Sequence, residues 1–261
     1  MIHLKNEQEI EAMRENALIV SDVHRLLMPH VKPGTRVSDL DAMAEDFIRA
    51  SGARPAFKGY GSGSTSVPAF PATLCVSIDD EVVHGIPSNR VLEEGQIVSI
   101  DVGTEKDGFF GDGAMTHPVG AVEAEKLRLL QVTRESLYRG ISKAIAGNHL
   151  GDISSAIQGH IEDNGFSVVR DLVGHGIGKK LHEEPPVPNF GRQGSGPLLE
   201  EGMTLAIEPM VNYGSFRVRI EANGWTVRTR DGAPSAHFEH TIVISKDGPV
   251  LLTNHFDREN G

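Results

Sequence analysis

Two aspartates lie on neighbouring strands of a predicted hairpin. Asp101 ends the apolar strand of residues 97–102, a turn follows, and Asp112 lies on the return strand. If residues 106–107 form the loop, the aspartates are directly opposite; if residues 107–108 form it, they are diagonal neighbours, and in both registers they share a face. Adjacent carboxylates repel one another unless a cation neutralises them. The pair therefore predicts a metal site, with two solvated aspartates on an edge hairpin as the alternative.

A second set of candidate ligands follows in the later part of the chain. His175 lies between glycines in the run Val-Gly-His-Gly-Ile-Gly of residues 173–178, which lets the backbone turn tightly and leaves the imidazole unobstructed. His182 precedes Glu-Glu-Pro-Pro, Glu208 ends an apolar strand, and Glu239 lies on a strand with an apolar tail. A lone histidine usually only satisfies polar neighbours, but buried carboxylates need partners. These residues favour the metal interpretation over the surface alternative.

An internal repeat links the two sets. Residues 92–101 read LEEGQIVSID and residues 199–208 read LEEGMTLAIE, with five identities in ten. Upstream, the histidine turn of His84 matches that of His175. Two helical segments match further upstream, through Gly34, Asp39, Ile48 and Gly52 in one and Gly147, Asp152, Ile161 and Gly165 in the other. Three matches in the same order predict two related halves.

The spacing of the repeat predicts where the halves differ. The three matches have offsets of 113, 91 and 107 residues, so extra residues lie in the loop-forming segment 59–71 of one half and near residues 185–197 of the other. We expect one domain over residues 1–261, built of halves at about 30–120 and 145–250. A pseudo-twofold arrangement would bring both sets of candidate ligands to one central site.

Hydrophobic periodicity predicts the helices and strands that position these residues. The first helix covers residues 7–28 and ends at Pro29; the second opens with a capping box of Ser38 and Asp41 and stops at Gly52. Further helices are expected at about residues 122–146 and 152–164, and strands at residues 73–78, 97–104, 109–116, 167–173, 203–211, 225–229 and 237–245.

Composition and charge exclude several classes of protein. The net charge of −11 and the lack of any stretch rich in Lys and Arg argue against nucleic acid as a direct partner. A single cysteine, Cys75, excludes an intrachain disulfide and indicates a reducing compartment. The charged N-terminus has no secretion signal, and no stretch approaches 18 uninterrupted apolar residues. We expect a cytoplasmic protein that does not enter a membrane.

Seven short motifs follow one another along nearly the whole chain. They are Val83-His84-Gly85-Ile86-Pro87, Ile100-Asp101-Val102-Gly103, Gly111-Asp112, Gly174-His175-Gly176-Ile177-Gly178, His182-Glu183-Glu184-Pro185, Ile207-Glu208-Pro209-Met210 and Phe238-Glu239-His240-Thr241. Together they resemble the type I methionine aminopeptidases of the bacterial kind. The resemblance implies an α/β (α+β) pita-bread fold, also called the creatinase/aminopeptidase fold, with pseudo-twofold symmetry, an antiparallel central sheet and outer helices. It makes the single expected domain a metallopeptidase catalytic domain.

The resemblance also implies a centre of two divalent metal ions. Asp112 and Glu239 would bridge the ions, Asp101 would bind one of them, and His175 with Glu208 would bind the other. Four carboxylates and one imidazole suit manganese, ferrous iron or cobalt, with zinc as a further candidate. The ions would activate a bridging water and polarise the scissile carbonyl, while Glu208 shuttles the proton as a catalytic residue.

Two histidines and an apolar pocket would bind the substrate. By resemblance, His182 would hydrogen-bond the developing oxyanion and His84 would contact the nitrogen side of the peptide, so both are candidate catalytic and substrate-binding residues. The wall of the methionine pocket would consist of Tyr60, Phe70, Cys75 and Trp225.

Two features depart from the common pattern of the family. Leu181 stands where an aromatic residue often precedes the histidine, and the segment of residues 61–69 is longer than usual. Both leave the predicted ligands untouched and leave the side-chain specificity open. Three other histidines match no functional role and are expected only to satisfy polar neighbours: His160, His237 and His240.

The resemblance implies metal-dependent removal of the initiator methionine from nascent proteins and peptides with a small second residue, because a large one would crowd the cleft. The expected partners are nascent polypeptide N-termini, with contact to the ribosome left open. The resemblance also implies a monomer. The sequence does not name the physiological metal.

Three alternatives remain beside this interpretation. An X-Pro aminopeptidase or prolidase-like enzyme shares the five ligands but carries an extra N-terminal domain, and only about 80 residues precede His84 here. Type II methionine aminopeptidases carry a long insertion in the second half, whereas Glu208 and Glu239 are only 31 positions apart. A non-catalytic binding module of the same fold should have lost ligands, and this chain lacks none of the five.

Overall fold

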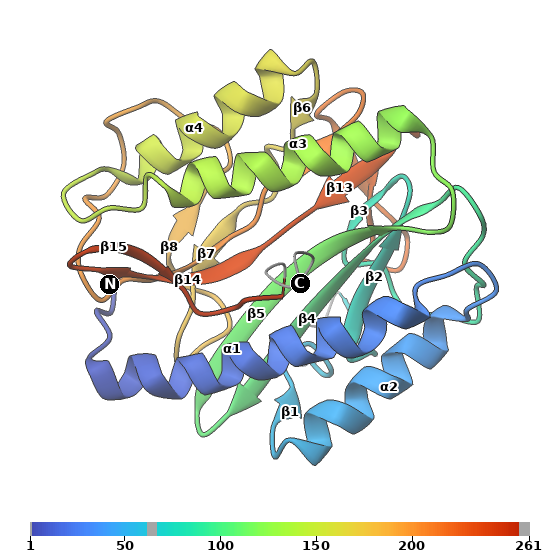
Figure 1. Ribbon diagram of the computed structural model, residues 1–261, viewed down its shortest axis with the longest axis horizontal. Coiled ribbons are helices and arrows are strands. Elements are labelled where there is room, and N and C mark those ends of the chain that lie inside the picture. The colour runs from blue at the N-terminus through green and yellow to red at the C-terminus, as the bar shows by residue number, and fades with distance from the viewer. Residues whose placement is uncertain (1, 62–66, 256–261) are drawn as a thin grey trace.

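Two pairs of helices flank the strands. The computed structural model describes residues 2–61 and 67–255. The helices are α1 (Glu7–Leu27), α2 (Val37–Ala50), α3 (Ala124–Ile141) and α4 (Leu150–Asp163), with a 3₁₀ turn at Met28–His30. In Figure 1, α1 and α2 run along one side of the strands and α3 and α4 along the other. None of the helices in the described ranges is long and apolar enough to cross a membrane.

The first helix begins and ends close to its predicted limits. At its start, the Asn6 side chain accepts the backbone N–H of Glu9 at 3.0 Å, and Glu9 Oε2 accepts the N–H of Asn6 at 3.1 Å. This reciprocal capping box fixes where the chain enters the helix. The helix stops at Leu27, and the 3₁₀ turn contains Pro29, which cannot continue an α-helix.

The predicted capping box of the second helix is wrong. Helix α2 begins at Val37 after the extended residue Arg36 and has no side-chain cap. The Asp41 carboxylate instead accepts the backbone N–H groups of Thr73 at 3.0 Å and Leu74 at 2.8 Å. Asp41 therefore ties the helix to the strand that starts at Leu74, an interaction between distant segments that local spacing does not reveal.

The last two helices also differ from prediction at their ends. Helix α3 stops at Ile141 rather than near residue 146, and α4 starts two residues earlier than expected. The Asp152 carboxylate accepts the N–H of His149 at 2.7 Å and that of Gly194 at 2.9 Å. This aspartate fixes the start of α4 and holds a loop against it.

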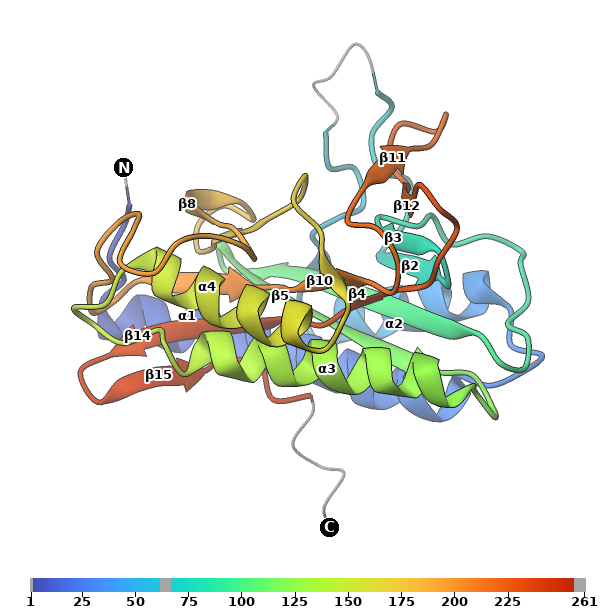
Figure 2. The same cartoon turned by 90° about the horizontal axis from the view of Figure 1, so that it is seen from above.

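The strands within the described ranges pair antiparallel in four sheets. They are β1 (Arg54–Pro55), β2 (Leu74–Ile78), β3 (Glu81–Val83), β4 (Ile97–Lys106), β5 (Phe109–Pro118), β6 (Ser167–Val168), β7 (Gly174–Gly176), β8 (Glu183–Val187), β9 (Thr204–Ile207), β10 (Met210–Asn212), β11 (Val218–Ile220), β12 (Val227–Thr229), β13 (Ser235–His237), β14 (His240–Ser245) and β15 (Gly248–Leu251). One sheet has the order β1–β4–β2 with β5 paired to β4, and another has the order β15–β14–β9–β7–β8. The small sheets are β13–β10–β6 and β11–β12–β3, and β11 and β12 project from the side opposite α3 (Figure 2).

The expected mixture of outer helices and antiparallel sheets is confirmed, but several strands are shorter than predicted. The run at 167–173 contributes only β6, and the run at 225–229 contributes only β12. Strands β1, β3, β7, β8, β11 and β15 were not predicted. Most of these span two to four residues, which is too short for an alternating pattern, and β8 contains two prolines.

The same connectivity occurs twice along the chain. The order β2–β4–β5 in one sheet corresponds to β7–β9–β14 in the other, and each follows a helix pair. Isolated bridges join Arg36 to Val91 in one case and His149 to Leu198 in the other. Arg36 and His149 are 113 positions apart, and Val91 and Leu198 are 107 positions apart. These are the offsets that the sequence repeat predicts for the helical segments and for the Leu-Glu-Glu-Gly turns.

The middle match of the repeat is wrong. Ser77 of β2 pairs with Ser99, and His175 of β7 pairs with Ala206, which is the repeat partner of Ser99. Strand pairing therefore makes His175 the equivalent of Ser77 in the other repeat, with an offset of 98 residues. With the same offset, the repeat equivalent of His84 is His182 and not His175. Sequence comparison joined the wrong pair because both histidines precede a glycine and an isoleucine.

Each helix pair packs on its own sheet. Helices α1 and α2 bury Leu27, Leu40 and Ile48 in a cluster with residues of β2 and β4. Helices α3 and α4 bury a second cluster with residues of β9 and β14, in which Ile153 and Ile157 are fully buried. The two cores place the sheet strands, and with them the candidate ligands, between the helix pairs.

The packing of α3 on α4 can be tested at Gly140. A Cβ there would lie 2.6 Å from Ile157 Cγ1, and overpacking costs about 1–3 kcal/mol, more than the roughly 1 kcal/mol by which alanine favours a helix. Gly140→Ala should therefore lower the free energy of urea unfolding. In the control, Gly159→Ala on the exposed face of α4, the new Cβ meets nothing within 4 Å, so stability should rise by up to about 1 kcal/mol. A Gly140→Ala protein more stable than wild type would contradict this packing.

Candidate metal centre

All the predicted site residues meet at one cavity of about 110 Å³. It contains the five predicted ligands, both predicted substrate histidines and the four predicted pocket residues. Phe57 and Leu181 complete the wall, and neither was predicted as a pocket residue. The full lining is Phe57, Tyr60, Phe70, Cys75, His84, Asp101, Asp112, His175, Leu181, His182, Glu208, Trp225 and Glu239.

The hairpin of β4 and β5 carries the two aspartates in the diagonal register. Lys106 pairs with Phe109, so residues 107 and 108 form the two-residue loop, both with positive φ. Asp101 then pairs with Ala114, two positions from Asp112. The shared face that both registers predicted brings the two carboxylates to the cavity side by side.

The two glutamates lie where strands are interrupted. Sequence patterns predicted continuous strands at 203–211 and 237–245, but the first breaks between β9 and β10 at Glu208 and the second between β13 and β14 at Glu239. Outside the regular ladder, Glu239 donates its N–H to Ala114 O at 2.9 Å. The Glu208 carbonyl accepts from Asn189 Nδ2 at 2.9 Å. These breaks leave both carboxylates in the cavity wall.

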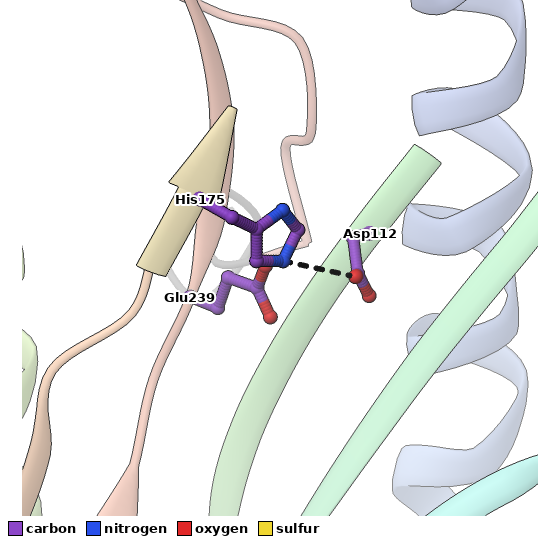
Figure 3. Close-up of side chains that lie close together, drawn as sticks. All are labelled: Asp112, His175 and Glu239. Carbon is purple, nitrogen blue, oxygen red and sulfur yellow. Dashed lines mark ion pairs between the residues drawn. The ribbon is translucent and has the colours of Figure 1, made fainter. Parts of the chain in front are cut away.

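The remaining ligand candidate, His175, lies on β7 and points toward the carboxylates. Its Nε2 atom is 3.8 Å from Asp112 Oδ2 and 3.6 Å from Glu208 Oε1. Figure 3 shows the side chains of His175, Asp112 and Glu239 converging from three separate segments of the chain. Their ligand atoms lie within 4.8 Å of one another, as do those of Glu208, His237 and Glu239. Both groups include Glu239, and the second also includes His237, which is not one of the five predicted ligands.

The cavity holds more negative charge than the surrounding protein neutralises. Burial raises the pKa of Asp101 to about 7. Burial and then the Asp101 carboxylate raise the pKa of Asp112 well above its usual range, and burial followed by Asp112 does the same for Glu239. Asp101 Oδ1 and Glu239 Oε1 are buried without a hydrogen-bond partner among the described residues.

Divalent cations fit this site. Unpartnered buried carboxylate oxygens are costly, and a cation of charge +2 both pairs with them and removes their mutual repulsion. The donor set of four carboxylates and an imidazole is the mixed oxygen and nitrogen environment that first-row divalent metals accept. The residues present therefore fit the predicted metal centre.

Glu208 differs electrostatically from the other carboxylates. Burial would raise its pKa, but the contacts with His237 and His175 outweigh burial and lower the pKa. His237 Nε2 lies 3.3 Å from Glu208 Oε2. This contact places the His237 imidazole beside a candidate ligand, and the expectation that His237 only satisfies polar neighbours stays a prediction. All three histidines without a predicted role, His160, His237 and His240, lie outside the cavity lining.

His182 lies at the mouth of the cavity with its ring edge against His175, at a centroid distance of 4.3 Å. Tyr60 Oη lies 2.7 Å from His182 Nδ1. Partial burial, and then the neighbouring His175, lower the pKa of His182 to about 4, so its ring is neutral at pH 7. Burial raises the pKa of Tyr60, which keeps its proton. With the Tyr60 hydroxyl as donor to Nδ1, the single ring proton of His182 lies on Nε2.

Hydrogen bonds to the N-terminal segment hold the loop that carries His182. Lys5 Nζ, almost fully buried, donates to Glu183 Oε2 at 2.6 Å, and Glu183 Oε1 accepts the N–H of Lys180 at 3.1 Å. The N–H of Lys5 is in turn bonded to Gly202 O at 2.8 Å. The N-terminal segment thus holds the residues on both sides of His182 in place.

His84 adopts a backbone conformation that is rare for a residue with a side chain. Its φ is 58°, in the left-handed region, and its carbonyl accepts the Thr226 hydroxyl at 3.3 Å. The ring stands edge-on to Trp225 at a centroid distance of 6.5 Å, and burial lowers the pKa of His84. A neutral imidazole is therefore held at the cavity wall.

Aromatic rings form the apolar wall. Trp225 packs edge-on against Phe70 at 5.4 Å and Tyr60 at 6.4 Å between centroids, and its Nε1 donates to Pro68 O at 2.8 Å. Cys75 is buried, and burial raises the pKa of its thiol, so it contributes packing. Of the segment 61–69 that the sequence marks as long, residues 62–66 lie outside the described residues.

Comparison with known proteins agrees with this geometry. A methionine aminopeptidase from Clostridium perfringens is 52% identical over 254 residues, which cover 97% of this chain and 99% of that protein. Residues 11–246 match the profile of Metallopeptidase family M24. The chain belongs to metallopeptidase family M24. Membership of this family implies divalent metal ions, in agreement with the fit of the cavity.

Solved structures of M24 proteins define the fold further. A methionine aminopeptidase from Thermotoga maritima superposes with a TM-score of 0.93 at 43% identity, covering 97% of this chain and 100% of that one. A prolidase from Pyrococcus furiosus reaches a TM-score of 0.76 at 22% identity over 65% of its own chain, which is a likeness of fold alone. The family resemblance and the pita-bread fold predicted from the sequence are confirmed.

The raised carboxyl pKa values predict that metal binding releases protons. At pH 6, below the pKa of about 7 of Asp101, this carboxyl is mostly protonated in the metal-free protein, and a cation binds only its ionised form. Calorimetric titration of Mn²⁺ in buffers of different ionisation enthalpy should show more protons released at pH 6 than at pH 8. Asp101→Asn should reduce this difference, and the protons of Asp112 and Glu239 account for the rest. Equal release at both pH values would contradict the raised pKa.

Proposed function

We propose that this M24 protein is a metal-dependent methionine aminopeptidase that removes the initiator methionine from nascent proteins and peptides with a small second residue. The observation that carries the proposal is the cavity itself, in which buried carboxylates adjoin an apolar wall of Tyr60, Phe70, Cys75 and Trp225. The acidic side can hold metal and the apolar side can hold a methionine side chain. The high identity to methionine aminopeptidases over nearly the full chain supports this choice.

The proposed metal ligands are Asp101, Asp112, His175, Glu208 and Glu239, which would hold two divalent ions. When bound, the ions supply Lewis-acid polarisation of the scissile carbonyl and activation of a water molecule. The donor set favours manganese, cobalt or ferrous iron, with zinc as a further candidate. Glu208, whose pKa stays low, is ionised at neutral pH and can accept a proton and return it to the leaving amine.

His182 and His84 are the proposed substrate-contacting residues. Because Tyr60 occupies Nδ1 of His182, the Nε2 proton is available to donate to the oxygen on which charge develops. His84, whose ring packs against Trp225, also lines the cavity and can contact the nitrogen side of the peptide. The preference for a small second residue belongs to the same proposal, because a large one would crowd the cavity.

The proposed function also implies a location, partners and a domain organisation. A protein of this activity would act in the cytoplasm as a monomer on emerging N-termini, with the ribosome as a partner and without direct dependence on nucleic acid. It would be one catalytic domain over residues 1–261, with related halves at about 30–120 and 145–250. The repeated order of strands supports the two halves.

Peptide cleavage tests the proposed function. Metal-free protein supplied with Mn²⁺, Co²⁺, Fe²⁺ or Zn²⁺ should release methionine from Met-Ala-Ser but not from Met-Lys-Ser, and should not cleave Ala-Pro-Ser. Asp112→Asn and Glu239→Gln should abolish cleavage while leaving the circular dichroism spectrum unchanged; Glu184→Gln, at an exposed carboxylate outside the cavity, is the control. Cleavage of Ala-Pro-Ser would identify an X-Pro peptidase, and metal binding without any cleavage would identify a binding module.

The role of the Tyr60 hydroxyl gives a second test. Tyr60→Phe keeps the ring against Trp225 and removes only the hydrogen bond to His182. A hydrogen bond worth about 1 kcal/mol corresponds to a loss of roughly five- to tenfold in kcat. His182→Ala should lower kcat further, and both variants should retain wild-type metal content. An unchanged kcat in Tyr60→Phe, or loss of bound metal in His182→Ala, would contradict the assigned roles.

A further inference from the structure

His237 is buried beside the candidate metal centre without being one of its predicted ligands. Only 1% of the residue is exposed. Its Nε2 atom has no hydrogen-bond partner among the described residues and lies 3.3 Å from Glu208 Oε2. A buried imidazole nitrogen without a partner is costly unless a neighbouring group uses it.

A network of hydroxyl groups fixes the backbone of His237. The Thr116 hydroxyl donates to His237 O at 2.8 Å and accepts the N–H of His237 at 2.9 Å. Ser99 Oγ lies 2.8 Å from the same Thr116 oxygen, which supplies a third hydrogen bond. All three residues are buried. The position of the imidazole is therefore set by β4 and β5, the strands that also carry Asp101 and Asp112.

Glu208 lies between two imidazoles that face different oxygens of its carboxylate. His175 Nε2 approaches Oε1 at 3.6 Å, and His237 Nε2 approaches Oε2 at 3.3 Å. Glu208 itself follows the end of β9, where the ladder no longer restrains it. A carboxylate outside regular secondary structure needs a contact besides the metal to hold it in one orientation. Metal-binding carboxylates generally accept a hydrogen bond from a neighbouring donor for this purpose.

We propose that His237 is a positioning residue for Glu208: its imidazole lies beside Oε2, with Nε2 at 3.3 Å, and donates to Oε2 when Oε1 is turned toward His175 and the metal. The imidazole acts through the carboxylate and does not itself bind the ion. This inference rests on the metal centre of the proposed function. It assigns to His237 a contribution to metal affinity that the sequence alone did not suggest.

Metal affinity tests the proposal independently of catalysis. Calorimetric titration of Mn²⁺ into metal-free protein should show that His237→Leu weakens binding at the site containing Glu208 by about 10- to 100-fold, the usual cost of losing such a partner. His237→Gln, whose amide can still donate, should restore an affinity close to the wild-type value. His117→Leu removes a buried histidine of β5 that does not line the cavity and should leave metal affinity unchanged.

The outcomes separate the inference from the metal centre itself. If the wild type binds Mn²⁺ and His237→Leu binds it equally well, the positioning role is overturned while the metal centre stands. If His237→Gln is as weak as His237→Leu, donation to Oε2 is not what His237 supplies, which also overturns the role. Absence of Mn²⁺ binding by the wild type would overturn the metal centre, and the inference with it. Should His237→Leu fail to fold, as judged by circular dichroism, the comparison of His237→Gln with wild type decides.

Discussion

Mutual repulsion among buried carboxylates is the constraint on which the structure of this site depends. Asp101, Asp112 and Glu239 have raised pKa values because the chain withdraws them from water and places them together, and two of their buried oxygens have no partner among the described residues. A protein keeps such an arrangement when a multivalent cation compensates it. The two helix-covered sheets supply the rigidity that holds like charges in place before the metal arrives.

The site is built where the sheet of β4 and β5 meets the sheet of β9 and β14. Thr241 donates its hydroxyl to Asp112 O at 2.8 Å, and Glu239 donates its N–H to Ala114 O, so β14 is hydrogen-bonded to β5 beside both aspartates. Interruptions of the ladder at Glu208 and Glu239 free these side chains to enter the cavity. In the apolar wall, Tyr60, Phe70 and Trp225 lie outside the strands, whereas Cys75 lies on β2.

Much of the site was predictable because its ligands occur in short local motifs. The Asp101–Asp112 hairpin followed from alternation and turn chemistry, and the order of motifs identified the family. The strand breaks at Glu208 and Glu239 could not be predicted, because the apolar pattern continues across them. His237 and Phe57 were missed, since their roles arise from pairing between distant segments. The Asp41 error has the same cause: a capping pattern is local, whereas its true partners, Thr73 and Leu74, lie on another element.

The central claim is that one cavity holds two ions through shared carboxylates, and anomalous X-ray diffraction from crystals soaked in Mn²⁺ tests it most directly. Two anomalous peaks are predicted in the cavity, both within bonding distance of Asp112 and Glu239, one also bound by Asp101 and the other by His175 and Glu208. A cavity without anomalous density at saturating Mn²⁺, or peaks bound only by surface carboxylates elsewhere, would contradict the account.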